Sequence, residues 1–331
     1  MILEDLSAVS APLPWQAGQW QEIHNALQAG QLPHALMLSG SAGIGKHRFA
    51  LALARLLLCH HSEAGTNCGS CKACELSRNQ THGDLRWLQP EGTSRVIKID
   101  QVRSALAFCQ KTASFGERKV LVIAPADTLN TNAANALLKC LEEPAAGTHI
   151  ILVCQRPHSI PATVRSRCQQ LVFPLPDTAE ATQWLAPIVG EAQGAGASDF
   201  LELAGGRPLL AQSLFLTDAG AALKARGAVL AELISGQVSA SEASAVFADV
   251  SLEELTGFMI EQLERRLRQA AHNETHSGAD SGADRQASRA MFVLLDELRR
   301  GQAAVVSGAN PSRDLYLQTT LGRWQSVLGG A

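Results

Sequence analysis

The chain lacks several features that would place it in a specialised class. It has no excess of positive charge, since 28 Lys and Arg residues stand against 31 Asp and Glu residues and the formal net charge is -3. A protein that coats DNA through a global basic field is not indicated, so any contact with nucleic acid has to be local. There is no uninterrupted apolar run long enough to cross a membrane. Residues 1–12 carry two acids and no cationic segment, so we expect no signal peptide and a cytoplasmic location.

The distribution of the cysteines along the chain does not indicate a disulfide framework. Four of the eight cysteines fall within residues 59–74, and the other four are scattered, at Cys109, Cys140, Cys154 and Cys168. This distribution favours one metal site plus buried free thiols. The remaining composition, 46% hydrophobic and 18% charged over 331 residues, predicts an ordinary globular protein of two or three domains.

The most informative stretch is residues 40–47, which read GSAGIGKH. They follow the apolar run 35–39 and precede a helical pattern at 48–58, which is the strand, loop and helix context of a phosphate-binding loop. In such loops the glycines let backbone N–H groups curl round phosphates, and the lysine balances the β- and γ-phosphate charge. The candidate nucleotide-contacting residues are Gly40, Gly43, Gly45 and Lys46.

The positions that would hold magnesium are missing. His47 stands where the loop pattern has a serine or threonine, and imidazole is a poor ligand for this hard, oxygen-preferring ion. The β-branched run 119–123 predicts a buried strand, and Ala124 and Pro125 follow it where an ATPase has its magnesium-binding and water-activating acids. Asp127 lies two residues further on, out of that register; a cap of a turn or helix is favoured for it, and a metal-ligand role stays open.

Four cysteines form a C-x8-C-x2-C-x2-C pattern: Cys59, Cys68, Cys71 and Cys74. Such turns present thiolates at the separation that tetrahedral Zn²⁺ prefers, and four sulfur ligands would make a closed, structural site. A redox-active pair and incidental buried thiols remain alternatives. His60 and His61 are competing ligands, which we rank below the cysteines because a fourth sulfur matches the other three in softness.

Apolar runs that predict strands alternate with amphipathic helical patterns in the first half of the chain. The strands are expected at 35–39, 85–88, 96–99, 119–123, 150–153 and 171–173, with Asp100 as the N-cap of a helix and a further helix at 130–144. This order indicates a parallel sheet covered by helices, which is an α/β fold.

The pattern changes at residue 174, after which helical signals dominate. Residues 174–212 predict a small helical lid. Residues 213–331 carry no strand signal and predict an all-α bundle, with amphipathic segments at 222–234, 251–271, 287–300 and 311–328 and a small-polar loop at 273–284. We therefore predict three domains: a P-loop-like domain over 1–173 with a zinc module at 59–74, the lid over 174–212, and an oligomerising collar over 213–331.

Three motifs together resemble a known family. They are residues 135–144, NALLKCLEEP; the triplet Ser166-Arg167-Cys168; and the four-cysteine insertion, with Asn310-Pro311 as weaker support. With the phosphate loop and the lid, the sequence resembles the bacterial clamp-loader subunits of the AAA+ superfamily over nearly its whole length. The absent magnesium positions resemble those of the family member that does not hydrolyse ATP.

This resemblance implies a role for Arg167 as an arginine finger that acts in trans. It would reach the γ-phosphate of ATP held by an adjacent motor subunit, where a guanidinium can place two parallel N–H bonds on phosphoryl oxygens. Residue patterns alone favour an ordinary ion pair on the chain's own surface. Arg165 is a nearby alternative finger. Arg207 falls where the family's lid has a second nucleotide-sensing residue, and we expect a structural role for it.

The function that the resemblance implies is that of a rigid, non-hydrolysing subunit of a clamp loader. Its partners would be the gamma/tau motor subunits, the delta subunit, and, through the assembled complex, the sliding clamp and primed DNA. Zinc would be structural, and ATP would be bound by a neighbour. Two alternatives remain: a catalytically active AAA+ ATPase that tolerates His47, and a zinc-dependent DNA-binding protein, which the net charge disfavours.

Overall fold

The computed structural model describes residues 7–92, 94–190, 196–217, 219–277, 282–306, 309 and 311–329. Its internal contacts divide the chain into two compact units, Met1–Ser213 and Leu214–Ala331. Each unit has a hydrophobic core of its own. The finer division into domains at 173/174 and 212/213 stays a prediction.

The first unit is built on a five-stranded, wholly parallel sheet in the order β2-β3-β4-β1-β5. The strands are β1 (Ala35–Ser39), β2 (Leu85–Leu88), β3 (Lys119–Ile123), β4 (Thr148–Cys154) and β5 (Gln169–Val172). All residues of β1 and β3 are buried, as expected for strands covered on both faces. The predicted parallel sheet is therefore confirmed.

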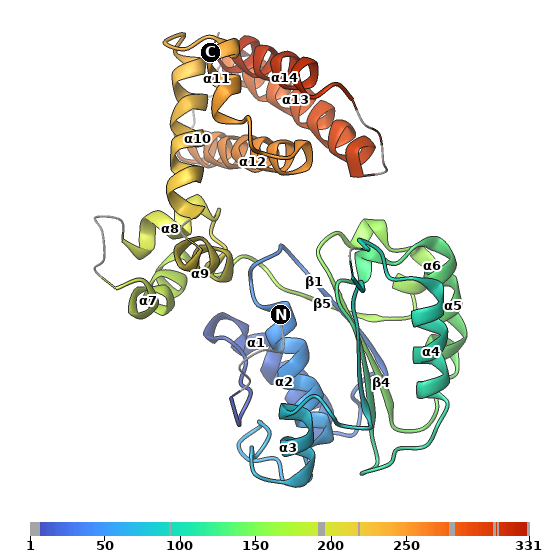
Figure 1. Ribbon diagram of the computed structural model, residues 1–331. Coiled ribbons are helices and arrows are strands. Elements are labelled where there is room, and N and C mark those ends of the chain that lie inside the picture. The colour runs from blue at the N-terminus through green and yellow to red at the C-terminus, as the bar shows by residue number, and fades with distance from the viewer. Residues whose placement is uncertain are drawn as a thin grey trace. The chain divides into compact units, whose positions relative to one another are not determined.

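Helices cover both faces of this sheet, which makes three layers (Figure 1). On one face lie α4 (Ile99–Cys109), α5 (Thr131–Glu142) and α6 (Ala162–Arg165); on the other lie α1 (Ala17–Gln28), α2 (Lys46–Leu58) and α3 (Lys72–Arg78). Because side chains alternate along a strand, Met37 joins the core under α4 and α5, while Leu36 and Leu38 join the core under α1 and α2. The core under α4 and α5 is aliphatic apart from four cysteines, and the core under α1 and α2 also contains Trp20, Phe49 and Phe173.

Three helices follow the sheet within or next to the first unit: α7 (Thr178–Val189), α8 (Ala197–Leu203) and α9 (Pro208–Leu216). Asp177 is the N-cap of α7, because its Oδ1 accepts a hydrogen bond from the backbone N–H of Ala179 at 2.8 Å. The start of α9 contacts the phosphate loop, as described below. The three helices occupy the stretch 174–212 that was predicted as a lid, and α9 continues past it to Leu216.

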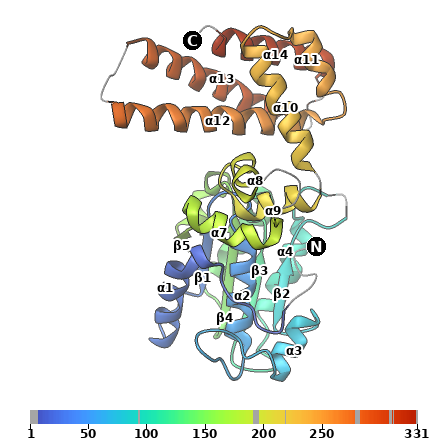
Figure 2. The same cartoon turned by 90° about the vertical axis from the view of Figure 1, so that its left-hand side faces the viewer.

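Helices are the only regular secondary structure in the described residues of the second unit. It comprises α10 (Ala219–Ile234), α11 (Ala240–Val246), α12 (Leu252–Ser277), α13 (Gly282–Val306) and α14 (Arg313–Leu328). The helices α12 and α13 run side by side (Figure 2), and Trp324 of α14 is buried at 1% exposure in the core that they share. Among the described residues no helix combines the length and apolar character needed to cross a membrane.

Three local predictions were wrong. Residues 96–99 do not form a strand, because only Ile97 bridges to Leu129 and Ile99 already opens α4. The N-cap of α4 is Lys98, whose backbone N–H donates to Oε1 of Gln101 at 2.9 Å, so Asp100 lies in the first turn instead. The helices α12 and α13 continue into the stretch 273–284 that was expected to be a loop, and residues 278–281 lie outside the described residues.

Candidate functional site

Two carbonyl groups of the phosphate loop between β1 and α2 accept hydrogen bonds from other parts of the chain. The carbonyl of Gly43 accepts from the backbone N–H of Leu209, at the start of α9, at 2.9 Å. The carbonyl of Ile44 accepts from Nε1 of Trp15 at 2.9 Å and from Nε2 of Gln16 at 3.1 Å. We call these three bonds the latch. They fix the N-terminal segment and the lid onto the loop.

Two glycines make the latch possible. Gly43 and Gly45 have φ values of +78° and +93°, in the left-handed region that other residues rarely adopt. A Cβ atom on Gly43 would lie 2.9 Å from Cβ of Leu210, and one on Gly45 would run into the side chain of Leu13. The loop glycines therefore serve close packing against protein in this chain, besides any role towards phosphate.

Lys46 is turned towards its own loop. Its Nζ donates to the carbonyls of Gly40 at 2.7 Å and Ser41 at 2.6 Å, and the residue is only 2% exposed. Burial lowers the pKa of Lys46 to about 8, against opposing effects of Cys154 and Asp127. The ammonium group of Lys46 is thus bonded to main-chain acceptors of its own loop.

The magnesium-linked positions offer no suitable ligand. Burial, reinforced by the charge of Lys46, lowers the pKa of His47 to about 4, so its imidazole is neutral at physiological pH. Its buried Nε2 has no hydrogen-bond partner within the described residues. Ala124, at the end of β3, is fully buried and apolar.

Asp127 contacts the end of β4 instead of capping its own turn. Its Oδ1 accepts from the backbone N–H of Gln155 at 3.0 Å, and its Oδ2 lies 3.6 Å from Nε of Arg156. The side chain is 4% exposed. The expected cap of a turn or helix is therefore wrong: Asp127 lies within the short turn Ala126–Thr128, and its carboxylate binds the segment that follows β4.

Arg167 lies between α6 and β5 with 36% of its side chain exposed. Its Nε and Nη2 contact Oε1 of Glu142, the last residue of α5, at 2.7 and 2.6 Å. The surface ion pair that residue patterns favoured is therefore present, and the exposure leaves the guanidinium accessible.

The two other candidate arginines are engaged differently. Nη1 of Arg165 lies 3.3 Å from Nδ1 of His158. Nε of Arg207 donates to the carbonyl of Ala204 at 2.6 Å, at the end of α8. This contact agrees with the structural role expected for Arg207.

The structure brings the sulfurs of Cys59, Cys68, Cys71 and Cys74 together, all within 4.8 Å of one another. The Sγ atoms of Cys59 and Cys71, and of Cys68 and Cys74, are 3.9 Å apart, and those of Cys59 and Cys74 are 3.6 Å apart. A tetrahedral zinc ion with Zn–S bonds of about 2.3 Å sets its sulfurs about 3.8 Å apart. The four thiols are therefore able to hold a zinc ion.

Three of the four sulfurs accept hydrogen bonds from nearby N–H groups. The backbone N–H of Cys68 donates to Sγ of Cys59 at 3.3 Å, and that of Cys71 donates to Sγ of Cys68 at 3.4 Å. Nδ2 of Asn67 donates to Sγ of Cys74 at 3.3 Å. Such bonds favour the charged form of sulfur. His60 is engaged elsewhere, since its Nε2 lies 3.0 Å from the carbonyl of Phe115.

A buried arginine ties the cysteine module to the rest of the unit. Arg55 of α2 is 1% exposed, and its Nε donates to Oγ of Ser77 in α3 at 3.2 Å. Its Nη1 and Nη2 donate to the carbonyls of Ser7 and Ala8, both at 2.8 Å, and Nη1 also donates to Oγ of Ser10. Burial lowers the pKa of Arg55; the nearby Cys74 and Cys59 oppose this shift, and Arg78 adds to it. Sequence reasoning did not single out Arg55.

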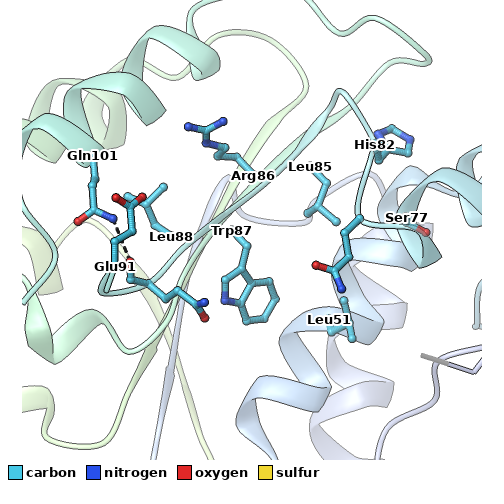
Figure 3. A pocket seen from close by; sticks show the side chains of 11 residues that line it. Leu51, Ser77, His82, Leu85, Arg86, Trp87, Leu88, Glu91 and Gln101 are labelled. Atoms are coloured by element: carbon cyan, nitrogen blue, oxygen red, sulfur yellow. Dashed lines mark hydrogen bonds between the residues drawn. The ribbon is translucent and has the colours of Figure 1, made fainter. Parts of the chain in front are cut away.

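A cavity of about 360 Å³ lies along the edge strand β2 (Figure 3). Trp87 points into it, and the indole Nε1 is buried without a partner within the described part of the chain. None of the predicted site residues lines this cavity. Its lining residues are Leu51, Ser77, Gln80, His82, Leu85, Arg86, Trp87, Leu88, Gln89, Glu91 and Gln101.

The parallel sheet, the phosphate-type loop after β1, the helices that follow the sheet and the helical C-terminal unit define an α/β protein with an all-α second unit and a four-cysteine module. Residues 15–177 match the family described as DNA polymerase III, delta subunit. The chain is 35% identical over 328 residues to the DNA polymerase III subunit delta' of Pseudomonas aeruginosa, covering 96% of this chain and 98% of that protein. It belongs to the family of DNA polymerase III delta' subunits.

Two further similarities are more distant. The chain is 33% identical to the DNA polymerase III subunit tau/gamma of Haemophilus influenzae over 167 residues, which is 50% of this chain and 24% of that protein. Among solved structures it is similar to a DNA polymerase III gamma subunit-related protein from Thermotoga maritima. The identity is 16% and the TM-score 0.46, over 93% of this chain and 99% of the other.

We expect removal of metal from the cysteine module to lower the stability of the first unit. Treating the zinc-loaded chain with a strong chelator should lower its melting temperature, because four thiols held close together lose the ion that balances their charge. The measurement is thermal unfolding with zinc content determined in parallel. In a Cys71→Ser variant the chelator should have a much smaller effect. A zinc-free preparation as stable as the loaded one would contradict this role.

We also expect His47 to make stability depend on pH. Its pKa is about 4 in the folded chain and 6.5 when unperturbed, so the unfolded state binds more protons between these values. Its contribution is fully present above pH 6.5 and is lost as the pH falls towards 4. His82 and His149 act in the same direction, because burial also lowers the pKa of each.

The test is therefore a comparison of two chains. Denaturant unfolding from pH 4 to 7 should show a shallower pH dependence for His47→Gln than for the unaltered chain. Equal slopes would mean that His47 titrates normally in the folded state.

Proposed function

We propose that this chain is a non-hydrolysing subunit of the DNA polymerase III clamp loader. It serves as a rigid scaffold and supplies Arg167 in trans to ATP bound by an adjacent gamma/tau motor subunit. Through the assembled complex, which includes the delta subunit, it takes part in the ATP-driven loading of the sliding clamp onto primed DNA in the cytoplasm. The polymerase's nucleotidyltransferase activity belongs to the holoenzyme and not to this chain.

The observation that carries the proposal is the state of the phosphate loop. The carbonyls of Gly43 and Ile44 are bonded to the lid and the N-terminal segment, and Lys46 is bonded to the loop itself. ATP hydrolysis needs magnesium and an acid that orients water, and the residues at those positions are His47, Ala124 and Pro125. A loop used in this way supports a scaffold better than a motor.

Arg167 is the group that we propose acts on the neighbour's nucleotide. It is exposed, permanently charged and close to the end of a strand at the edge of the sheet, where a second subunit has access. An arginine finger stabilises the charge that develops on the transferred phosphoryl group, and the effect on rate is about 10³ to 10⁵. We propose zinc as the resident metal of the four cysteines, with a purely structural role.

The alternative is a catalytically active AAA+ ATPase subunit. The observation in its favour is that Gly40, Gly43, Gly45 and Lys46 are all present, so that backbone N–H groups could still cradle phosphate.

We expect the purified chain alone to show no turnover of Mg-ATP. Without a magnesium ligand or a water-orienting acid, the chemical step is not accelerated even if nucleotide binds. The measurement is phosphate release by the isolated chain, with a Lys46→Ala variant beside it. Turnover that Lys46→Ala abolishes would establish the active ATPase instead.

We expect Arg167→Ala to depress ATP hydrolysis in the assembly reconstituted with motor subunits, clamp and primed DNA. The site that receives Arg167 should slow by a factor of about 10³ or more, which leaves only the activity of the other sites. The chain should stay folded, because exposed ion pairs stabilise proteins by about 1 kcal/mol at most. Arg165→Ala is the matched control and should retain the full rate. Full activity of Arg167→Ala would place the finger elsewhere.

A further inference from the structure

The guanidinium of Arg167 is almost fully occupied by its own chain. Nε donates to Oε1 of Glu142 at 2.7 Å, and Nη2 lies 2.6 Å from the same oxygen in an ion pair. Nη1 donates to the carbonyl of Thr163 at 2.9 Å and to Oγ of Ser166 at 3.3 Å. All three nitrogens of the guanidinium therefore face a group of the same chain: Nε and Nη1 through hydrogen bonds, and Nη2 through the ion pair.

This arrangement is not one that can receive a phosphoryl group. A guanidinium binds phosphate best through two parallel N–H bonds from a single edge. Glu142 takes the edge formed by Nε and Nη2, and Thr163 and Ser166 take the Nη1 half of the other edge. Arg167 must therefore give up one set of partners before it can bind phosphate in that way.

Glu142 is the partner that carries a charge and is poorly placed without Arg167. It ends α5, where the helix dipole disfavours a carboxylate. Lys139, one turn earlier, is the kind of residue that this end favours. Half of the Glu142 side chain is exposed, so the pair is reached by water and by salt and can exchange.

We infer that Glu142 holds Arg167 in a withdrawn position, and that the finger engages by exchanging this carboxylate for a phosphoryl oxygen of the neighbouring nucleotide. The inference rests on the proposed function. It adds that the carboxylate of Glu142 competes with the phosphoryl oxygens for the guanidinium of Arg167. No bond is made or broken in this step except hydrogen bonds and the ion pair.

The test is Glu142→Gln in the reconstituted assembly, which removes the charge and keeps the shape of the side chain. At low salt and subsaturating ATP, hydrolysis should rise roughly 1.5- to 5-fold, the range that exposed ion pairs are worth. The difference from the unaltered assembly should shrink as salt is raised to about 0.5 M, where the Debye length falls to a few ångströms.

The matched control is Glu143→Gln, a change at the adjacent acid, which makes no contact with Arg167 that the structure shows; it should leave the rate unchanged. A fall in rate with Glu142→Gln, like that of Arg167→Ala, would overturn the inference, because Glu142 would then support the engaged position. An unchanged rate at every salt concentration would also overturn it.

A measurement on the free chain separates this inference from the proposed function. In the nitrogen-15 NMR spectrum, the Nε–H of Arg167 should exchange with water more slowly in the unaltered chain than in Glu142→Gln. Equal exchange would show that the contact does not hold the arginine. If Arg167→Ala keeps full activity, the finger itself fails. If Arg167→Ala slows hydrolysis while Glu142→Gln has no effect, only the withdrawn position fails.

Discussion

The organisation of the first unit depends on where the carbonyl groups of the phosphate loop find their donors. Those of Gly43 and Ile44 are satisfied by Leu209, Trp15 and Gln16, so the loop joins the lid and the N-terminal segment to the sheet. Ile44 is buried, and an unsatisfied carbonyl there would cost about 1–3 kcal/mol. A nucleotide cycle that moved the lid and the N-terminal segment away from the loop would have to break these three hydrogen bonds in each round. The same bonds that weaken the case for hydrolysis therefore favour a subunit that keeps one shape.

The groups proposed to act on other molecules lie away from this loop. The helix α5 begins after Asn130, whose side chain caps it through the N–H of Ala133, and it ends at Glu142 beside Arg167. The ion-pair partner of the proposed finger thus belongs to a helix that packs on the sheet, and not to the phosphate loop. Arg167 and the phosphate loop are therefore held by different elements, so changes in the residues of the loop need not displace Arg167.

The sequence predicted the elements better than it predicted the contacts between them. The strands at 35–39, 85–88 and 119–123 were confirmed to the residue, because continuous apolar runs have few other solutions in a parallel sheet. Residues 96–99 failed because a capping bond from Gln101 outweighed β-branched propensity. The cysteine cluster was predictable from local spacing. The latch and the environment of Arg55 were not, since their partners lie far apart in sequence and carry no pattern of their own.

Arg55 links the first described residues of the chain to the helix that follows the cysteines. Its guanidinium is buried and is bonded to Ser7, Ala8 and Ser10 on one side and to Ser77 on the other. If the four-cysteine module moved away from α2, Arg55 would lose its hydrogen bond to Ser77 and its contact with the nearby sulfurs. The guanidinium that binds residues 7–10 would then be held less firmly. The rate of proteolytic cleavage near residue 8 would consequently depend on the metal occupancy of the four cysteines, although no cysteine lies in the cleaved segment.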